Sequence, residues 1–131
     1  MPRDSKTLIS IVIPVYNEAE GLPSLFERLS EILPKLGVPH EVILVDDGSR
    51  DGSFETIKKL STPERPVRAL SFRRNYGQTA ALAAGIDEAH GDIIVTLDSD
   101  LENDPRDIPK LLAKLDEGYD VVSGWRQDRW Q

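Results

Sequence analysis

Cysteine is absent from this sequence of 131 residues. A disulfide framework, a thiolate metal site and a cysteine nucleophile are therefore excluded. The absence also gives no sign of an oxidising compartment, so the sequence is compatible with a reducing cytoplasm.

Long apolar runs are missing as well. No stretch approaches the roughly 18 to 20 residues that a membrane-spanning helix needs, and Met1 to Thr7 lack the apolar core of a signal peptide. With 39% hydrophobic residues and no repeat or linker-like tract, we expect a single soluble domain over residues 1–131.

Basic residues are outnumbered, 16 against 23 acidic ones, which leaves a net charge of −7. Nucleic-acid binding needs a basic face and is therefore not expected. The glycine-rich dinucleotide fingerprint and the phosphate-binding loop ending in Gly-Lys-Ser/Thr are also absent. Any nucleotide must be held in another way.

Apolar segments of strand length alternate with segments of helical periodicity. Helices are expected after Asn17, which has Glu20 at capping-box spacing, then around Ile57, over Gln78–Ala89, and from Asp104 to near Gly118. The alternation predicts an α/β, Rossmann-like, mostly parallel sheet with helices on both faces. The expected strands are Ile9–Val15, Glu41–Val45, Val67–Phe72, Ile93–Leu97 and Asp120–Ser123.

Polar residues follow the first four predicted strands directly. Ligands of open parallel sheets bind beyond the carboxyl ends of the strands, so we predict that these four segments form one site. The segments are Pro14-Val15-Tyr16-Asn17-Glu18, Asp46-Asp47-Gly48-Ser49, Arg73-Arg74-Asn75 with Gly77, and Asp98-Ser99-Asp100.

Asp98 and Asp100 stand two positions apart in a segment that leaves a strand, so both carboxylates are expected on one side. Hard oxygen ligands suit Mg²⁺ or Mn²⁺ with sites left open for phosphate oxygens. The alternative is a solvated turn that caps a helix. Clustered charge at four strand ends favours the functional interpretation.

The other strand ends leave two alternatives each. Asp46 follows an apolar strand and is a candidate acceptor for a base or ribose, whereas Asp47 either binds ligand or caps the turn before the second helix. Arg73 and Arg74 are either solvated or bring one guanidinium to a phosphate. His40 and His90 lack partners at metal-ligand spacing, and because both fall in predicted loops they are expected on the surface.

Five motifs together resemble glycosyltransferase family 2 over essentially the whole chain. The segment Arg73-x-Asn75-x-Gly77 is similar to its polyprenyl-phosphate branch, which includes dolichyl-phosphate mannose synthases and bacterial undecaprenyl-phosphate sugar transferases. The motifs are PVYNE at 14–18, VDDGSRDGS at 45–53, RRNYGQTAALAAGID at 73–87, LDSDLENDP at 97–105 and VVSGWR at 121–126.

The resemblance implies a GT-A fold and a donor site for a UDP- or GDP-sugar with Mg²⁺ or Mn²⁺. Asp98 and Asp100 would bind the metal and, with Arg126, act in catalysis. Glu102, where that branch commonly has glutamine, would be a third metal ligand. The residues expected to bind the nucleotide sugar are Pro14, Tyr16, Glu18, Asp46, Asp47, Arg73, Asn75, Gly77, Asp98 and Ser99.

The implied reaction inverts the anomeric carbon while the metal neutralises the departing diphosphate. A lipid-phosphate acceptor is already anionic and needs no general base, whereas a hydroxyl acceptor would need one.

Such family members continue well past Gly124-Trp125-Arg126, so we expect a truncated chain that binds donor but transfers poorly alone. The full-length protein is expected at the cytoplasmic face of the membrane; its oligomeric state is not indicated.

Three alternatives use related features. A binding module without catalysis would share the same crevice. A phosphoacceptor domain would carry its acidic pair after the first strand, where this sequence has Tyr16-Asn17-Glu18. A sugar-nucleotide pyrophosphorylase would need a glycine-rich loop there, and Ile13 to Glu18 contain no glycine.

Overall fold

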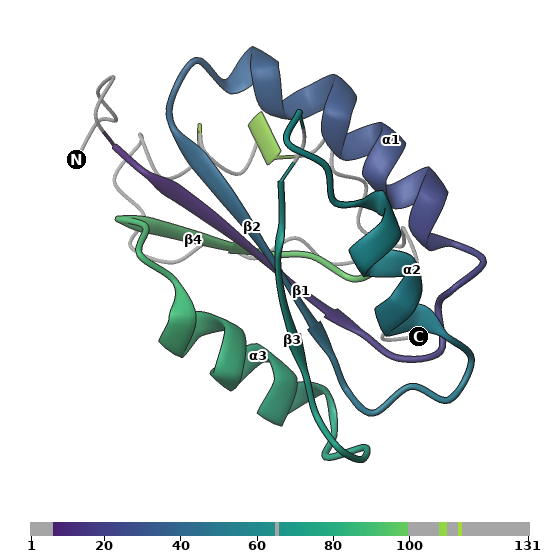
Figure 1. Ribbon diagram of the computed structural model, residues 1–131. Coiled ribbons are helices and arrows are strands. Elements are labelled where there is room, and N and C mark those ends of the chain that lie inside the picture. The colour runs from purple at the N-terminus through teal and green to yellow at the C-terminus, as the bar shows by residue number, and fades with distance from the viewer. Residues whose placement is uncertain (1–6, 65, 100–107, 110–112, 114–131) are drawn as a thin grey trace, which may run out of the picture.

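The computed structural model describes residues 7–64, 66–99, 108, 109 and 113 (Figure 1). Within these ranges, none of the helices has the length and apolar character needed to cross a bilayer. The elements are β1 (Ile9–Val15), α1 (Leu22–Ile32), the 3₁₀ helix η1 (Leu33–Leu36), β2 (His40–Asp46), α2 (Ser53–Leu60), β3 (Arg68–Ser71), α3 (Gln78–Glu88) and β4 (Ile93–Thr96).

The described strands form one parallel sheet in the order β3-β2-β1-β4. All seven residues of β1 are buried, as expected for a β-branched run at the centre of a sheet that is covered on both faces. The predicted α/β architecture and the first four predicted strands are thereby confirmed, with small differences in their ends. The predicted strand Asp120–Ser123 lies outside the described residues.

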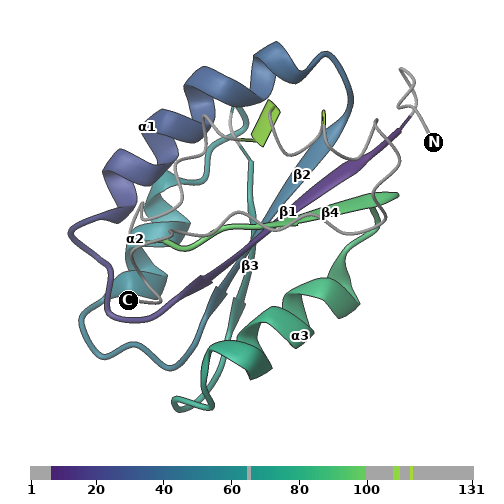
Figure 2. The same cartoon turned by 180° about the vertical axis from the view of Figure 1, so that it is seen from behind.

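Helices cover both faces of the sheet: α1 and α2 pack on one face and α3 on the other (Figures 1 and 2). The larger core lies under α1 and α2 and includes Ile11, Leu25 and Ile57. On the other face, α3 lies so close that a Cβ on Gly85 would approach Val12 Cγ1 to 2.4 Å. The small residues of α3 permit this approach, in agreement with the sequence.

The predicted start of the first helix is wrong. Asn17 does not cap α1, which begins after Gly21 without a side-chain cap. Asn17 instead takes a left-handed conformation with φ 51°, and its Oδ1 accepts a hydrogen bond from the amide of Arg50. A bond from the side chain to another loop has replaced the local capping bond that the sequence pattern favoured.

The far end of α1 is shaped by Pro34. Proline has no N–H to donate to the carbonyl four residues back, so the α-helix ends at Ile32 and continues as the tighter η1. Gly37 then adopts φ 69°, the left-handed conformation that is common after a helix. The sequence predicts the end of the first helix at this glycine.

Of the helix predicted from Asp104, only Ile108, Pro109 and Ala113 are described, and all three are helical.

A polar network lies at the amino end of the sheet, opposite the predicted site. Glu41 accepts hydrogen bonds from Ser10 Oγ (2.6 Å) and the His90 amide (2.7 Å), and Arg68 donates to it over 3.2 Å. Burial opposes ionisation of Glu41, but these hydrogen bonds outweigh it and hold the pKa of this carboxyl below its usual value. Fully buried Ser10 is thereby satisfied inside β1.

Replacing Glu41 with Gln is expected to lower the free energy of unfolding by about 1–3 kcal/mol at pH 7, because charge-assisted hydrogen bonds are lost. A lowered native pKa stabilises the fold above the unfolded pKa near 4.5, and that stability disappears as pH falls through the native pKa. The difference in the free energy of unfolding between wild type and Glu41→Gln should therefore become smaller below about pH 4.5. Urea unfolding at several pH values measures it.

Glu88→Gln is the matched control, because Glu88 pairs with the same Arg68 at 2.7 Å but its side chain is half exposed. It should cost less than about 1 kcal/mol. A Glu41→Gln deficit that stays constant between pH 7 and pH 3 would show that packing, not charge, is responsible.

Candidate functional site

A cavity of about 280 Å³ opens at the carboxyl edge of the sheet, between the ends of β1 and β4. β1 connects to β2 on one side while β4 lies on its other side, so the cavity sits at the point where the strand order reverses. Ligands of open α/β sheets bind at such points. The residues that line it are Pro14, Val15, Tyr16, Glu18, Asp47, Asn75, Gly77, Gln78, Asp98 and Ser99.

The structure brings together all four predicted strand ends. Asp46 and Arg73 belong to these segments but are not among the lining residues. Asp100, Glu102 and Arg126 lie outside the described part of the chain. The other predicted binding residues line the cavity: Pro14, Tyr16, Glu18, Asp47, Asn75, Gly77, Asp98 and Ser99.

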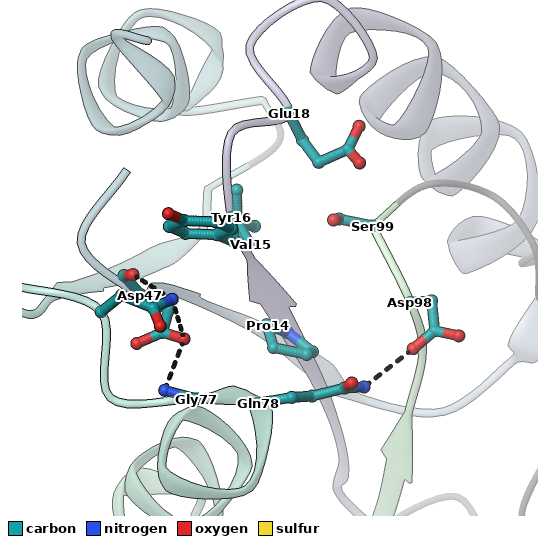
Figure 3. Close-up of a pocket in the computed structure, with 10 residues that line it drawn as sticks. Pro14, Val15, Tyr16, Glu18, Asp47, Gly77, Gln78, Asp98 and Ser99 are labelled. Atoms are coloured by element: carbon teal, nitrogen blue, oxygen red, sulfur yellow. Dashed lines mark hydrogen bonds between the residues drawn. The ribbon is translucent and has the colours of Figure 1, made fainter. Parts of the chain in front are cut away.

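Two lining residues, Val15 and Gln78, were not among those expected to bind the nucleotide sugar, although Val15 belongs to the first predicted segment. Gln78 is the first residue of α3, and its Nε2 donates to Asp98 Oδ1 at 3.2 Å across the cavity (Figure 3). Its position directly after Gly77, at the end of the Arg-x-Asn-x-Gly segment, was the available signal. Val15 is the last residue of β1 and contributes an apolar surface.

Asp98 enters the cavity because the chain stays extended beyond β4. The Leu97 amide donates to the carbonyl of Val12 at 3.1 Å, which continues the pairing with β1 for one residue. Asp98 then lies half-buried at the cavity and Ser99 is buried. In Figure 3, Asp98 and Ser99 form one side of the cavity, with Glu18 beyond Ser99.

Asp47 is bound by the loop that leads into α3. Its Oδ1 accepts from the Tyr76 amide at 2.7 Å, and its Oδ2 accepts from Asn75 Nδ2 at 2.9 Å and the Gly77 amide at 3.0 Å. Asn75 Nδ2 also reaches the Asp47 carbonyl at 3.2 Å. Asp47 is only 3% exposed, so this carboxylate is largely enclosed by its own donors.

The loop after β1 is attached to the loop after β2. Four hydrogen bonds join them, three of which hold successive amides of the first loop. The pairs are Asn17 N with Ser49 Oγ (2.8 Å), Glu18 N with Ser53 Oγ (2.9 Å), Ala19 N with Asp51 Oδ2 (3.0 Å) and Arg50 N with Asn17 Oδ1 (2.9 Å).

Asp51 organises this attachment. Its burial opposes ionisation, but hydrogen bonds from Ser53 Oγ and from the amides of Ala19 and Ser53 outweigh it, so the pKa of Asp51 is lowered. Ser53 is fully buried. Its Oγ donates a hydrogen bond to Asp51 and accepts one from the Glu18 amide. The loop that carries Tyr16 and Glu18 is therefore fixed from the β2 side.

Asp46 carries a buried oxygen without a partner. Oδ2 accepts from the Ser49 amide at 3.2 Å, whereas Oδ1 has no hydrogen-bond partner among the described residues. The side chain is 2% exposed. An unpaired buried carboxylate oxygen is costly and rare in native structures, which marks Asp46 as a position with unused binding capacity.

Neither arginine of the third strand end is among the residues that line the cavity. Arg73 and Arg74 are exposed, and the Arg74 guanidinium lies 4.9 Å from the centre of the Tyr76 ring. His40 and His90 are exposed, as predicted, although His40 begins β2 and does not lie in a loop, and His90 takes part in the Glu41 network at the opposite end of the sheet.

The cavity lining is acidic. Glu18, Asp47 and Asp98 contribute carboxylates, and no lysine or arginine is among the lining residues that are described. Oxygen donors of this kind fit Mg²⁺ or Mn²⁺. The described residues contain no cluster of three or more acidic, histidine or cysteine side chains that could hold a metal ion.

Comparison with curated proteins identifies an undecaprenyl-phosphate 4-deoxy-4-formamido-L-arabinose transferase of Pectobacterium atrosepticum. It is 49% identical over 122 residues, which cover 92% of this chain and 37% of the relative. The chain thus spans little more than a third of that relative's length. The relative is named for undecaprenyl phosphate, in keeping with the polyprenyl-phosphate branch that the sequence resembles.

Solved structures share the fold. The Mycobacterium tuberculosis glucosyl-3-phosphoglycerate synthase, in complex with Mn²⁺, UDP and glucosyl-3-phosphoglycerate, superposes with TM-score 0.73 and 28% identity over 94% of this chain and 46% of that one. The Pyrobaculum calidifontis mannosyltransferase PcManGT, in complex with GDP-Man and Mn²⁺, gives TM-score 0.71 and 24% identity over 89% and 34%. These likenesses confirm the expected GT-A fold. The family model described as glycosyl transferase family 2 matches residues 10–129, and this chain therefore belongs to that family.

Proposed function

We propose that this chain holds the nucleotide-sugar donor of a glycosyltransferase that transfers the sugar to a polyprenyl phosphate. The acidic cavity at the strand-order reversal is the observation that carries this proposal. Among the described residues, its lining has three carboxylates and no basic side chain, so a diphosphate would be repelled unless a divalent cation lay between them.

A bound Mg²⁺ or Mn²⁺ would neutralise the charge that develops on the departing nucleoside diphosphate. Asp98 is the described residue that would hold it, and we propose Asp100 and Glu102 as further ligands and Arg126 as a further catalytic residue. Two structural neighbours were solved with Mn²⁺ together with a nucleotide or a nucleotide sugar, which supports a divalent metal in this fold.

The nucleotide would lie along the ends of β1 and β2. Pro14 and Tyr16 line the cavity, and Tyr16 is 47% exposed, which leaves its ring available for contact with a flat base. Asp46 would accept hydrogen bonds from base or ribose through its unpaired oxygen. We assign the remaining contacts to Glu18, Asp47, Arg73, Asn75, Gly77 and Ser99.

The acceptor assignment rests on the curated relative at 49% identity, which is named for undecaprenyl phosphate. A lipid phosphate is anionic at neutral pH, so attack on the anomeric carbon would need no general base. Attack from the face opposite the leaving diphosphate would invert that carbon. We place the whole protein at the cytoplasmic face of a membrane, where donor and lipid acceptor meet.

Calorimetric titration tests the donor proposal. UDP, GDP and their sugar conjugates would be added to the chain with Mn²⁺, with Mg²⁺ or with a chelator. We expect one base to bind preferentially and only when the metal is present. Equal binding with and without metal, or no binding by any nucleotide, would contradict the proposal.

A further inference from the structure

We infer that Asp51 is a positioning residue of the donor site, which it affects through the loop formed by residues 16–19. The inference rests on the proposed function, because it assumes that the cavity binds the donor. Tyr16 and Glu18 of this loop line the cavity, whereas Asp51 is not among the lining residues (Figure 3). Asp51 is therefore expected to change donor binding by moving the loop.

Both oxygens of the Asp51 carboxylate are used as acceptors. Oδ2 accepts from the Ala19 amide at 3.0 Å, and Oδ1 accepts from the Ser53 amide at 3.0 Å and from Ser53 Oγ. Ser53 Oγ in turn accepts from the Glu18 amide at 2.9 Å. One carboxylate therefore holds two successive amides of the loop, Ala19 directly and Glu18 through Ser53.

Asn17 joins the same loop to the segment that contains Asp51. Its amide donates to Ser49 Oγ at 2.8 Å, and its Oδ1 accepts from the Arg50 amide at 2.9 Å. Asn17 has φ 51°, a left-handed conformation that is uncommon outside glycine and persists only where the surroundings fix it. The shape of the loop therefore depends on contacts from the loop after β2.

Tyr16 shows why this dependence matters for binding. It is 47% exposed, so packing against the core does little to fix its ring, and its position follows from the backbone that carries it. If that backbone took several conformations, only a fraction of molecules would present Tyr16 and Glu18 to the donor together. The apparent affinity would fall in proportion to that fraction. Asp51 thus preorganises the β1 side of the cavity.

Hydrogen exchange in the wild-type chain tests this preorganisation without a variant. The amides of Glu18 and Ala19 should already be protected in the free protein, and saturating nucleotide with Mn²⁺ should add little. Exchange as fast as in an unstructured peptide, with protection appearing only when nucleotide binds, would overturn the inference.

Asp51→Asn tests the role of the carboxylate. The new side chain has nearly the same shape but only one acceptor oxygen, so the amide of either Ala19 or Ser53 loses its partner. Exchange at Glu18 and Ala19 should become faster in the free variant. Nucleotide affinity in Mn²⁺, measured by calorimetric titration, should fall about tenfold, which matches the low end of the range for a hydrogen bond to a charged group, since Asp51 is exposed.

Two controls separate positioning from stability and from charge. Glu41→Gln is expected to lower stability at the opposite end of the sheet, and it should bind nucleotide as tightly as the wild type. Glu55→Gln removes an exposed carboxylate in the first turn of α2, close in sequence to Asp51, and should also bind normally.

An Asp51→Asn variant that unfolds more easily but binds nucleotide as tightly as the wild type would overturn the inference, because Asp51 would then be merely structural. Unchanged exchange at Glu18 and Ala19 in this variant would also overturn it. Failure of the wild type to bind any nucleotide would instead refute the proposed function, and the exchange rates of the free protein would still report on the loop.

Discussion

Asp98→Ala is expected to abolish metal-dependent nucleotide binding, with the dissociation constant in Mn²⁺ rising by more than about a hundredfold. Replacing a residue that hydrogen-bonds to a metal ligand lowers the affinity for the metal by about tenfold to a hundredfold. Loss of a direct ligand should lower it further. The acidic lining makes the effect larger, because the remaining carboxylates of Glu18 and Asp47 would repel a diphosphate without the cation. Calorimetric titration with and without Mn²⁺ measures it.

The diagnostic feature is the loss of the metal effect, not weaker binding alone. In a chelator, wild type and Asp98→Ala should bind nucleotide equally poorly. Asp98→Asn should behave like Asp98→Ala, although an amide of the same shape can still meet Gln78. Asp87→Ala is the charge-matched control, since Asp87 is exposed in the last turn of α3, whereas Gln78 at the cavity begins that helix. A metal response that survives in Asp98→Ala would refute the assignment of Asp98.

The sheet could be predicted from sequence because its strands are encoded locally. The run Ile9–Val15 is apolar and β-branched throughout, and the structure places a strand at those residues. The position of the cavity followed from the same pattern, because the carboxyl ends of parallel strands share an edge. The helix Gln78–Glu88 was also predicted within one residue, since its alanines favour helix and close packing together.

The roles of individual carboxylates could not be predicted, because they depend on contacts between segments far apart in sequence. Asp47 meets Gly77 thirty positions away, and Asn17 meets Arg50 thirty-three positions away. From sequence, Asp47 could cap the turn before the second helix and Asn17 could cap the first helix, because aspartate and asparagine are common in turns and at helix starts. Their actual partners lie close to them only in the folded sheet, where β1, β2 and β3 are side by side.

The segment from Asp47 to Ser53 connects these two cases. It lies between the loops after β1 and β3 and hydrogen-bonds to both. Asp51 accepts from the Ala19 amide of the first loop, and Asp47 accepts from the Gly77 amide of the second. Both flanking loops contribute to the cavity lining. The rigidity of the proposed donor site therefore depends on a loop that itself contributes only one of the lining residues, Asp47.

Gly48→Ala is expected to destabilise the protein by about 2–5 kcal/mol and to impair nucleotide binding together with stability. Gly48 has φ 72°, where an L-residue costs roughly 1–2 kcal/mol. The new methyl would also lie 2.2–2.6 Å from the backbone of Arg74 and Asn75, and overpacking of this kind costs about 1–3 kcal/mol more. Backbone atoms cannot change rotamer, so the loop itself must shift.

Gly52→Ala separates the two contributions within the same loop. Gly52 has a similar φ of 85°, but nothing lies within 4 Å of a Cβ placed on it. It should therefore lose only the conformational term, about 1–2 kcal/mol, and bind nucleotide as the wild type does. Urea unfolding and calorimetric titration of both variants would measure the difference. Equal losses of stability would mean that the loops at Gly48 and Arg74 separate at little cost, and that the cavity is not held from the β2 side by backbone packing.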